Sequence, residues 1–517
     1  MAALYCLGAL CACEDFDPPA PPSAAPIDAG SRAPGAPGAD AAPSSQADAG
    51  DGPASAPSAV ARATPNYVIV PDARDHAVAV IDPATLQVRH VPCGDAPELV
   101  SAAEDRDVAL VVDVAGERAC ALHIEDGEVR RSSVGLVPHV NRVEFAPRAR
   151  FALAFHDASA EAGDAPARTT QELSVIDLAE PGAARAGAVL AGLQPRAVAF
   201  GADGARAFVL SAEGIVSFDL AAAARGDVVR PPPLDFGLQL WGSATVRIAA
   251  DAGVALAFEP GSDILYSLDL RRGEVARVGL SELTAMSDDG GVPEQPRIAD
   301  AVISHDGAEI WVALRDEQAL LRIPLPDALT QLEAQPSDRL HWVDGEGALL
   351  VYAEDPADGR ATLVPVSAPD EARRVLLARA PDGVLSAESG DALGLLHDAR
   401  QLPAGYTLLR VRDGAIRFRQ TDAAPVAIAL SSAAGVLAAL VAASGDADPE
   451  LHLLDFETLA LRVEPLSAAP RALGFVGDGR FLYAQLAHPD GRLTFIDFTS
   501  GETRTATGFL IAERVRE

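Results

Sequence analysis

Short apolar runs recur along most of the chain, and many of them alternate with polar positions and end in an aspartate. The clearest copies follow the form Val-x-Val-Ile-Asp and lie at Val78–Asp82, Leu173–Asp177, Ile215–Asp219, Leu265–Asp269, Leu451–Asp455 and Leu493–Asp497. Weaker copies lie at Ala121–Glu125, Leu320–Pro324, Thr362–Val366 and Leu408–Arg412. From Asp82 to Asp497 the ten copies are spaced by about 46 residues on average. Short strands repeated at roughly 40–50 residues are typical of the blades of a β-propeller.

Most copies belong to a longer unit of strands joined by tight turns. In one unit, the strand Arg196–Phe200 precedes an Asp-Gly turn at Asp203, and the strands Arg206–Leu210 and Ile215–Asp219 follow. A further strand follows most of the aspartates, as at Glu274–Val278. We therefore predict an all-β fold, a β-propeller of about ten four-stranded blades. One ring is favoured, and fewer blades or two smaller rings are the alternatives.

The two ends of the repeat region do not match. The first unit begins at Tyr67–Val70 with no inner strand before it, whereas Phe509–Ala512 is a lone extra strand after the last unit. A propeller ring closes when one end of the chain supplies the strand that the other end lacks. We predict that the C-terminal strand Phe509–Ala512 pairs with the first blade, Tyr67–Cys93, and so closes one ring and hides its sheet edges.

Parts of the repeat resemble a known family. The residues that carry the resemblance are Tyr67–Val70 with His76–Thr85, Phe475–Asp478 with Arg480–Tyr483, and Thr494–Asp497 with Gly501. They are similar to the YVTN-type β-propeller repeat of bacterial surface and secreted proteins. The resemblance covers residues 66–517 and fades between Arg339 and Thr421. It implies a propeller outside the cytoplasm, usually of about seven blades, and ten units depart from that number.

The N-terminus resembles a bacterial lipoprotein signal. Residues 1–12 are apolar or small, and Leu10-Cys11-Ala12-Cys13 is similar to a lipobox ahead of an acylated cysteine. No arginine precedes the apolar stretch, which is short for a signal; a start codon assigned too far downstream would explain both departures. The resemblance implies a signal segment at residues 1–13 and lipidation of Cys13. The alternative is a small-residue N-terminus of no consequence.

Residues 14–65 are rich in proline, alanine, serine, glycine and aspartate and show no apolar periodicity. Such a segment buries too little apolar surface to offset chain entropy, so we expect a disordered linker. A lipid on Cys13 followed by this linker would form a tether. The chain then divides into the signal-like segment, the linker and a propeller over residues 66–517.

The charge of the chain excludes several partners. The formal net charge is −33, and the 41 basic residues are all arginine. This balance argues against nucleic acid and against docking on anionic lipid, because both need a basic surface. We expect membrane contact only through the lipid anchor. Without lysine, the protein has no amine for a Schiff base or a general base.

Two cysteines and four arginines are the candidate site residues of the repeat region. Cys93 and Cys120 lie in adjacent units and either form a disulfide in an oxidising compartment or remain two buried thiols. The arginines lie near the start of predicted innermost strands, and strand alternation places them on one face: Arg196, Arg297, Arg339 and Arg471. They either gather at one mouth of the channel to hold an anionic ligand, or each pairs with a carboxylate of its own or a neighbouring blade. Arg142 and Arg247 lie nearby, with a facing that alternation does not settle.

No catalytic motif or metal-ligand spacing accompanies these residues. The ten histidines form no His-x-His or His-x₃-His pair, and the chain has no P-loop, dinucleotide fingerprint or Gly-x-Ser-x-Gly elbow. We assign no catalytic residue, metal or cofactor. The expected function is that of a monomeric, lipid-anchored binding or scaffolding module of the cell envelope, for a protein, peptide or glycan. The alternative is a propeller enzyme, similar to a lactonase or a quinoprotein, with its site at the channel mouth.

Overall fold

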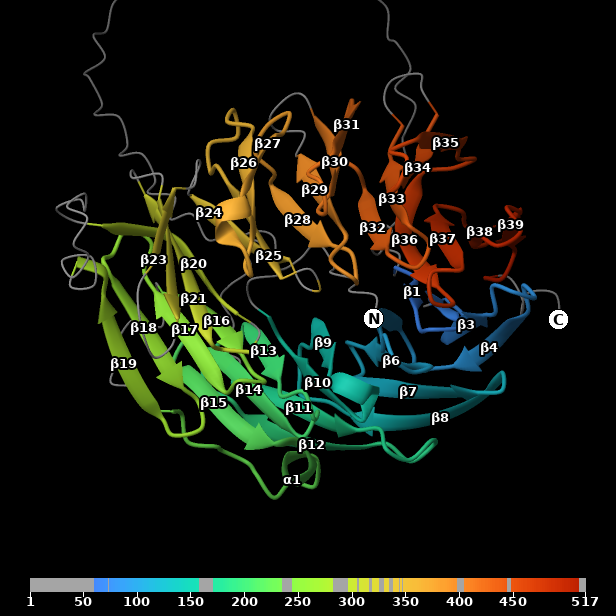
Figure 1. The fold of residues 1–517 in the computed structure, drawn as a ribbon. Coiled ribbons are helices and arrows are strands. Elements are labelled where there is room, and N and C mark those ends of the chain that lie inside the picture. Colours follow the sequence, from blue (N-terminus) through green and yellow to red (C-terminus); the bar gives the residue numbers. More distant parts are fainter. Residues whose placement is uncertain are drawn as a thin grey trace, which may run out of the picture. The chain divides into compact units, whose positions relative to one another are not determined.

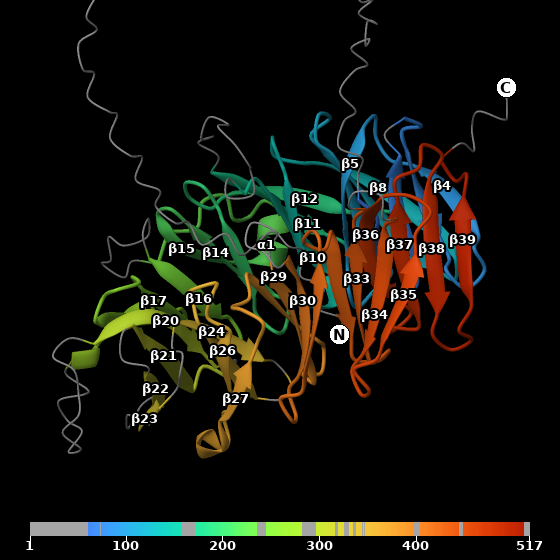
Figure 2. The same ribbon diagram turned by 90° about the horizontal axis from the view of Figure 1, so that it is seen from above.

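The computed structural model describes residues 60–510, except 73, 158–170, 235–243, 282–295, 305, 316–318, 325–329, 334–337, 344, 346, 398–403 and 444–447. The signal-like segment with Cys13 and residues 14–59 of the expected linker lie outside the described residues. The described part is all-β and forms one ring of ten antiparallel sheets, a ten-bladed β-propeller (Figures 1 and 2). The expected fold class and blade number are confirmed.

Each blade is one continuous stretch of sequence, and its strands pair in chain order. Blades 1 to 5 are β1 (Arg62–Ala63), β2 (Val68–Asp72), β3 (Ala77–Ile81) and β4 (Val88–Pro92); β5 (Pro97–Ala102), β6 (Val108–Asp113), β7 (Arg118–Glu125) and β8 (Glu128–Gly135); β9 (Arg142–Phe145), β10 (Phe151–Phe155), β11 (Glu172–Asp177) and β12 (Arg185–Leu190); β13 (Ala197–Phe200), β14 (Arg206–Ser211) and β15 (Gly214–Asp219); and β16 (Thr245–Ala249), β17 (Val254–Phe258), β18 (Ile264–Asp269) and β19 (Glu274–Gly279).

Blades 6 to 10 repeat this arrangement. They are β20 (Arg297–Ile303), β21 (Glu309–Arg315), β22 (Ala319–Pro324) and β23 (Thr330–Glu333); β24 (Arg339–Val343), β25 (Ala348–Tyr352), β26 (Arg360–Pro365) and β27 (Arg373–Leu376); β28 (Gly383–Ser386), β29 (Ala392–His397), β30 (Ala404–Arg410) and β31 (Ile416–Thr421); β32 (Ala427–Ser431), β33 (Val436–Val441), β34 (Glu450–Asp455) and β35 (Leu461–Pro465); and β36 (Pro470–Val476), β37 (Phe481–Leu486), β38 (Arg492–Asp497) and β39 (Thr503–Thr507).

The core is divided among the interfaces between blades. Ten apolar clusters of buried residues each lie between two neighbouring blades, and one of them joins blade 10 to blade 1. The second strands therefore have apolar neighbours on both faces, and β6 and β10 are buried at every position. The outer strand β8 is instead mostly exposed, with one buried residue, Val134. Burial on both faces explains why the strand signals are continuous apolar runs.

The aspartate of the repeat closes the turn between the third and fourth strands. Asp82 Oδ1 accepts a hydrogen bond from Ala84 N at 2.8 Å, and Asp455 Oδ1 accepts one from Thr458 N at 2.7 Å. An aspartate side chain that bonds to the backbone two or three residues later stabilises a tight turn locally. In the blades that contain it, the repeated aspartate is thus a structural residue.

Blade 4 departs from the four-stranded pattern. Asp219 accepts a hydrogen bond from Ala222 N at 2.7 Å and caps the short helix α1 (Leu220–Ala224) in place of a turn. Leu220 and Ala223 pack into the apolar cluster between blades 3 and 4. No helix in the described part of the chain is long and apolar enough to cross a membrane.

The ring does not close as the sequence predicts. The expected pairing of Phe509–Ala512 with the first blade is wrong, because β1 already occupies the inner position, with Arg62 opposite Ile69 and Ala63 opposite Val68. Phe509 follows β39 in a turn, and residues 511–512 lie outside the described part. A strand of only two residues has no periodicity, so β1 was hidden at the end of the proline- and alanine-rich segment.

Complete blades meet at the seam instead. Val70 and Ile81 of blade 1 pack in one cluster with Tyr483, Phe495 and Phe509 of the last repeat. Several hydrogen bonds cross the seam. Gly477 N donates to the carbonyl oxygen of Pro65, Ala61 N donates to Gln485 Oε1 at 2.8 Å, and Arg504 donates to the carbonyl oxygens of Ala84 at 3.0 Å and Pro83 at 2.9 Å. Side-chain packing and these few bonds close the ring.

Candidate functional site on the inner strands

The inner strands differ in how much of their side chains solvent reaches. In blade 4 all four residues of β13 are half-buried, and in blade 5 four of the five residues of β16 are half-buried. In blades 7 and 8, most residues of β24 and β28 are also half-buried. The inner strand β32 of blade 9 is buried after its first residue. Accessible side chains near the ring centre therefore include those on blades 4, 5, 7 and 8.

A buried carboxylate connects blades 5, 6 and 7. Asp300 of β20 is 5% exposed and accepts a hydrogen bond from Arg247 Nη2 of β16 at 2.8 Å. Its other oxygen accepts a hydrogen bond from Leu340 N of β24 at 3.0 Å. A β-bulge between Ile298 and Asp300 shifts the register of β20. Because a bulge re-aims the side chains that follow it, this irregularity sets the direction of the carboxylate.

A histidine and a serine continue this polar chain into blade 8. His341 Nε2 of β24 lies 3.0 Å from Ser386 Oγ of β28. Burial, helped by the positive charge of Arg247, lowers the pKa of His341 to about 4. The ring is therefore neutral at pH 7 and is a weak base there. It suits a hydrogen bond to a ligand better than proton abstraction from Ser386.

Three arginines lie at one end of blades 6 and 7: Arg297 begins β20, Arg315 ends β21 and Arg339 begins β24. Glu354 Oε1 is 2.7 Å from Arg339 Nη2, and Glu354 Oε2 is 3.1 Å from Arg315 Nη2. Arg297 lies directly opposite Arg315 in the register of β20 and β21. One carboxylate thus bridges arginines from two blades. Burial and the charge of Asp300 raise the pKa of the neighbouring Tyr352 to about 12, so its phenol remains protonated.

The four predicted arginines do not form one cluster. Arg297 and Arg339 lie on neighbouring blades and are connected through Arg315 and Glu354. Arg196 precedes β13 in blade 4, and Arg471 lies in blade 10. A register shift between Pro470 and Ala472 makes Arg471 the extra residue of a bulge.

Strand alternation did not predict which way these side chains face, because a bulge adds one residue and reverses the alternation of the residues after it. The alternative interpretation, in which each arginine pairs with a carboxylate, is observed for Arg339 and also for Arg247 and Arg142. Arg247 pairs with Asp300 of the next blade, and Arg142 lies 2.7 Å from Asp157 of its own blade. Sequence reasoning missed Asp300, His341 and Ser386. The available signal was an aspartate inside the apolar run of β20.

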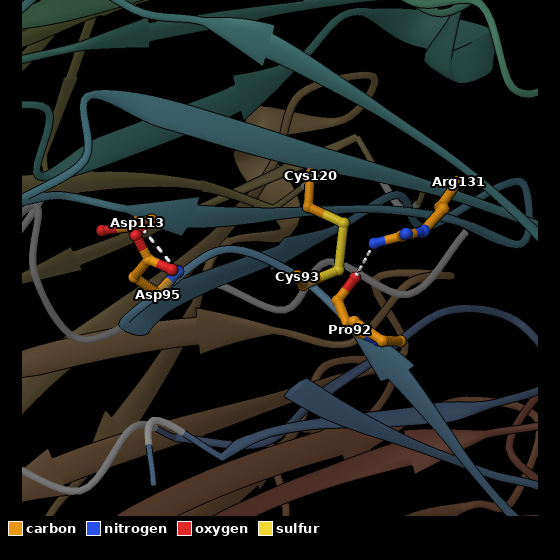
Figure 3. Close-up of a disulfide and its surroundings, with 6 residues drawn as sticks. All are labelled: Pro92, Cys93, Asp95, Asp113, Cys120 and Arg131. Atoms are coloured by element: carbon orange, nitrogen blue, oxygen red, sulfur yellow. Dashed lines mark hydrogen bonds between the residues drawn. A yellow bond between two sulfur atoms is a disulfide. The ribbon is translucent and has the colours of Figure 1, made fainter. Parts of the chain in front are cut away.

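The structure joins Cys93 and Cys120 in a disulfide with a Cα–Cα distance of 5.4 Å (Figure 3). Cys93 follows β4 of blade 1 and Cys120 belongs to β7 of blade 2, and both lie in the apolar cluster between these blades. The bond therefore fastens two neighbouring blades covalently. Of the two alternatives from the sequence, the described geometry is that of the disulfide.

A hollow of about 370 Å³ lies beside the disulfide. Arg118, Arg131 and Ser133 line it together with the two cysteines. Arg131 Nη1 donates to the carbonyl oxygen of Pro92 at 2.6 Å, as Figure 3 shows. Across the described residues, no group of three or more histidine, cysteine, aspartate or glutamate side chains has an arrangement suited to a metal ion.

The sequence matches no family model and no curated protein. Solved structures are similar at low identity. Dihydro-heme d1 dehydrogenase NirN, in complex with DHE, matches over 86% of this chain and 73% of its own at 14% identity, with a TM-score of 0.40. A eukaryotic initiation factor matches over 86% and 96% at 11% identity, with a TM-score of 0.49.

Hydrazine synthase of Kuenenia stuttgartiensis matches over 89% of this chain and 98% of its own at 12% identity, with a TM-score of 0.32. Superpositions this loose support no functional comparison. The strand pairing of the chain itself defines its class: it is a ten-bladed β-propeller.

Proposed function

We propose that this protein is a binding or scaffolding module of the cell envelope, tethered through a lipid on Cys13 and a flexible linker. The lipobox-like residues and the linker composition support the tether. The YVTN-like repeats support a location outside the cytoplasm. A disulfide between blades 1 and 2 is in keeping with that location, because disulfides persist in oxidising compartments.

The binding site that we propose is the polar chain on the inner strands of blades 5 to 8, and its ligand carries a carboxylate. The supporting observation is Arg247, whose side chain is 39% exposed and whose contact with Asp300 uses Nη2. A guanidinium has five donors in a planar fork that matches a carboxylate, so donors remain for a ligand. His341 and Ser386 lie on the adjacent inner strands and add neutral hydrogen-bonding groups.

The site is proposed for binding rather than for acyl transfer. A catalytic serine needs a base with a pKa near the working pH, and the pKa of His341 is lowered to about 4. Among the described residues, no carboxylate accepts a hydrogen bond from His341 and so orients the ring as in a catalytic triad. The pair therefore offers contacts to a ligand and little driving force for proton transfer.

Calorimetry with hexaglutamate tests the site. Arg247→Gln should weaken binding about 10-fold, the loss of about one charge-assisted hydrogen bond. Arg206→Gln changes the net charge equally at the exposed start of β14 and should leave the affinity within about 2-fold. Equal affinities for both variants, or no binding to the unmodified protein, would exclude this site. Because Arg247 also pairs with Asp300, His341→Gln is a second variant that keeps the ion pair.

The tether has its own test. Cys13→Ser should move the protein from the membrane fraction to the soluble fraction of cells. A variant that partitions as the unmodified protein does would refute lipidation at Cys13.

A further inference from the structure

The outermost strands of the nine four-stranded blades, which we call the rim, carry an unusual charge. They contain eleven arginines: Arg89, Arg130, Arg131, Arg185, Arg277, Arg373, Arg374, Arg417, Arg419, Arg462 and Arg504. They contain four acidic residues, Glu128, Glu274, Glu333 and Glu464. In the whole chain the ratio is reversed, with 41 basic and 74 acidic residues. The rim is therefore basic in an acidic protein.

Strand propensity does not explain this enrichment. Aspartate and glutamate are depleted in strands generally, which would favour arginine in every strand. The other thirty strands, however, contain thirteen arginines and fourteen acidic residues. The basic excess is specific to the strands that face outward.

Most of the rim arginines are exposed to solvent. Ten of the eleven are exposed, and Arg504, at the seam, is half-buried. The side chains of Arg185, Arg374 and Arg417 form no hydrogen bond or ion pair with any residue that the structure describes. An extended arginine on an edge strand presents a planar donor fork, which can bind carboxylate or sulfate groups with two parallel hydrogen bonds.

The hollow beside the disulfide lies at this rim and is a candidate binding site for one unit of such a partner. Arg118 at its wall is exposed, and its side chain makes no hydrogen bond or ion pair within the described part of the chain. Ser133, opposite Cys120 on β8, adds a hydroxyl. The acidic residue in the wall, Asp113, is 4% exposed, and its oxygens accept hydrogen bonds from Asp95 N at 2.9 Å and Gly116 N at 2.8 Å (Figure 3).

We propose that the rim binds an acidic polysaccharide, with one acidic sugar held in the hollow by Arg118, Arg131 and Ser133. A volume of about 370 Å³ is within the range of sites for small molecules. The carboxylate or sulfate of the sugar meets the arginines, and a hydroxyl meets Ser133. Neighbouring units of the polymer extend along the outer strands, where further arginines contact their charges. This surface is separate from the inner-strand site.

The observations favour a polysaccharide over other polyanions. Binding of single-stranded nucleic acid relies on aromatic side chains on which bases stack. The rim has one aromatic residue, Phe418, and its ring is half-buried against His397 at 5.6 Å between centroids. The outer strands face outward all around the ring, so a flat bilayer reaches only an arc of them. A flexible polymer follows a curved surface.

Affinity measurements with polygalacturonate oligomers test the proposal, with neutral dextran, a single-stranded oligonucleotide and anionic vesicles as alternative ligands. Polygalacturonate should bind most tightly, and its affinity should fall steeply between 50 and 200 mM salt (about 10-fold or more), because the contacts are ionic. No binding of polygalacturonate at 50 mM salt, or equal binding of the oligonucleotide or the vesicles, would overturn it.

Two triple variants with the same change in net charge distinguish the loss of rim contacts from the loss of positive charge in general. Arg374→Gln, Arg417→Gln and Arg419→Gln together should weaken binding about 10-fold or more. The control replaces Arg106, Arg148 and Arg150, which are exposed in the turns between the first and second strands of blades 2 and 3, and should change the affinity by less than about 2-fold. Equal weakening by both triples would reduce the effect to net charge and refute the proposal.

The single variant Arg118→Gln tests the hollow and should weaken binding about 5- to 10-fold. An unchanged affinity would remove the hollow from the proposal. Hexaglutamate binding at the inner strands should be unaffected by all rim variants, so the failure of one site is distinguishable from the failure of the other.

Discussion

Removing the side chain of Asp300 tests whether this carboxylate holds blades 5, 6 and 7 together. In Asp300→Ala, the buried amide of Leu340 loses its acceptor at 3.0 Å, and Arg247 loses its partner at 2.8 Å. A buried donor left without a partner costs about 1–3 kcal/mol. The ion pair contributes less, about 0.5–1 kcal/mol, because water reaches the guanidinium of Arg247. The expected total is about 1.5–4 kcal/mol.

Hydrogen exchange is the better assay, because a ring of many blades need not unfold in one step. If the amide of Leu340 exchanges by local opening, a loss of about 2 kcal/mol accelerates its exchange about 30-fold. Amides of blades 1 and 2, far from the change along the ring, should keep their protection. Asp105→Ala removes an exposed carboxylate and is the control, with an effect within about 0.5 kcal/mol.

A double-mutant cycle separates the two contributions. Arg247→Met keeps the apolar stem of the side chain and removes the charge, so its coupling to Asp300→Ala measures the ion pair alone. We expect a coupling of about 0.5–1 kcal/mol. The reasoning would be refuted if Asp300→Ala left both the denaturation midpoint and the exchange of Leu340 unchanged.

Three further outcomes follow from buried groups of the described blades. Burial lowers the pKa of His397 from 6.5 to about 4, so the unfolded chain binds a proton there that the folded ring does not. This group alone should lower the stability by about 2 kcal/mol from pH 7 to pH 5, in addition to the loss from His341, and His397→Gln should remove that share of the pH dependence in urea titrations. Replacing Cys93 and Cys120 by alanine should cost about 3.5 kcal/mol by the loop-entropy relation for a separation of 27 residues, and a reductant should destabilise only the unmodified protein. Gly187→Ala places a Cβ 2.1 Å from a backbone oxygen of helix α1 and should destabilise the protein by about 1–3 kcal/mol in thermal melts. Gly135→Ala, whose Cβ would have no atom within 4 Å, is the control and should be neutral. An equally large loss of stability in Gly135→Ala would contradict the steric explanation.

Much of the fold could be predicted because each blade repeats the same local solutions. The aspartate at the end of the third strand forms its own turn, so Asp82 and Asp455 mark their blades without reference to distant residues. The ring closure could not be predicted, because the two-residue strand β1 lies next to a segment with no apolar pattern. The sequence also does not reveal which strand will meet which at the seam.

The candidate site was predicted less well, since its geometry depends on register and on contacts between blades. The parity argument that grouped Arg196 with Arg471 assumed regular strands, and a bulge at Arg471 removes that assumption. Asp300 depends on a bulge of its own and on partners about 40 to 53 residues away in sequence. Such partners are set by how blades pack, which periodicity alone does not specify.

The absence of strand exchange at the seam has a consequence for how the molecule is made and how it can be rearranged. Since every described blade is a single uninterrupted segment, a nascent chain can complete each sheet in turn as it leaves the ribosome, and no sheet awaits the C-terminus. For the same reason, joining the old ends and cutting the chain between any two blades should preserve every sheet.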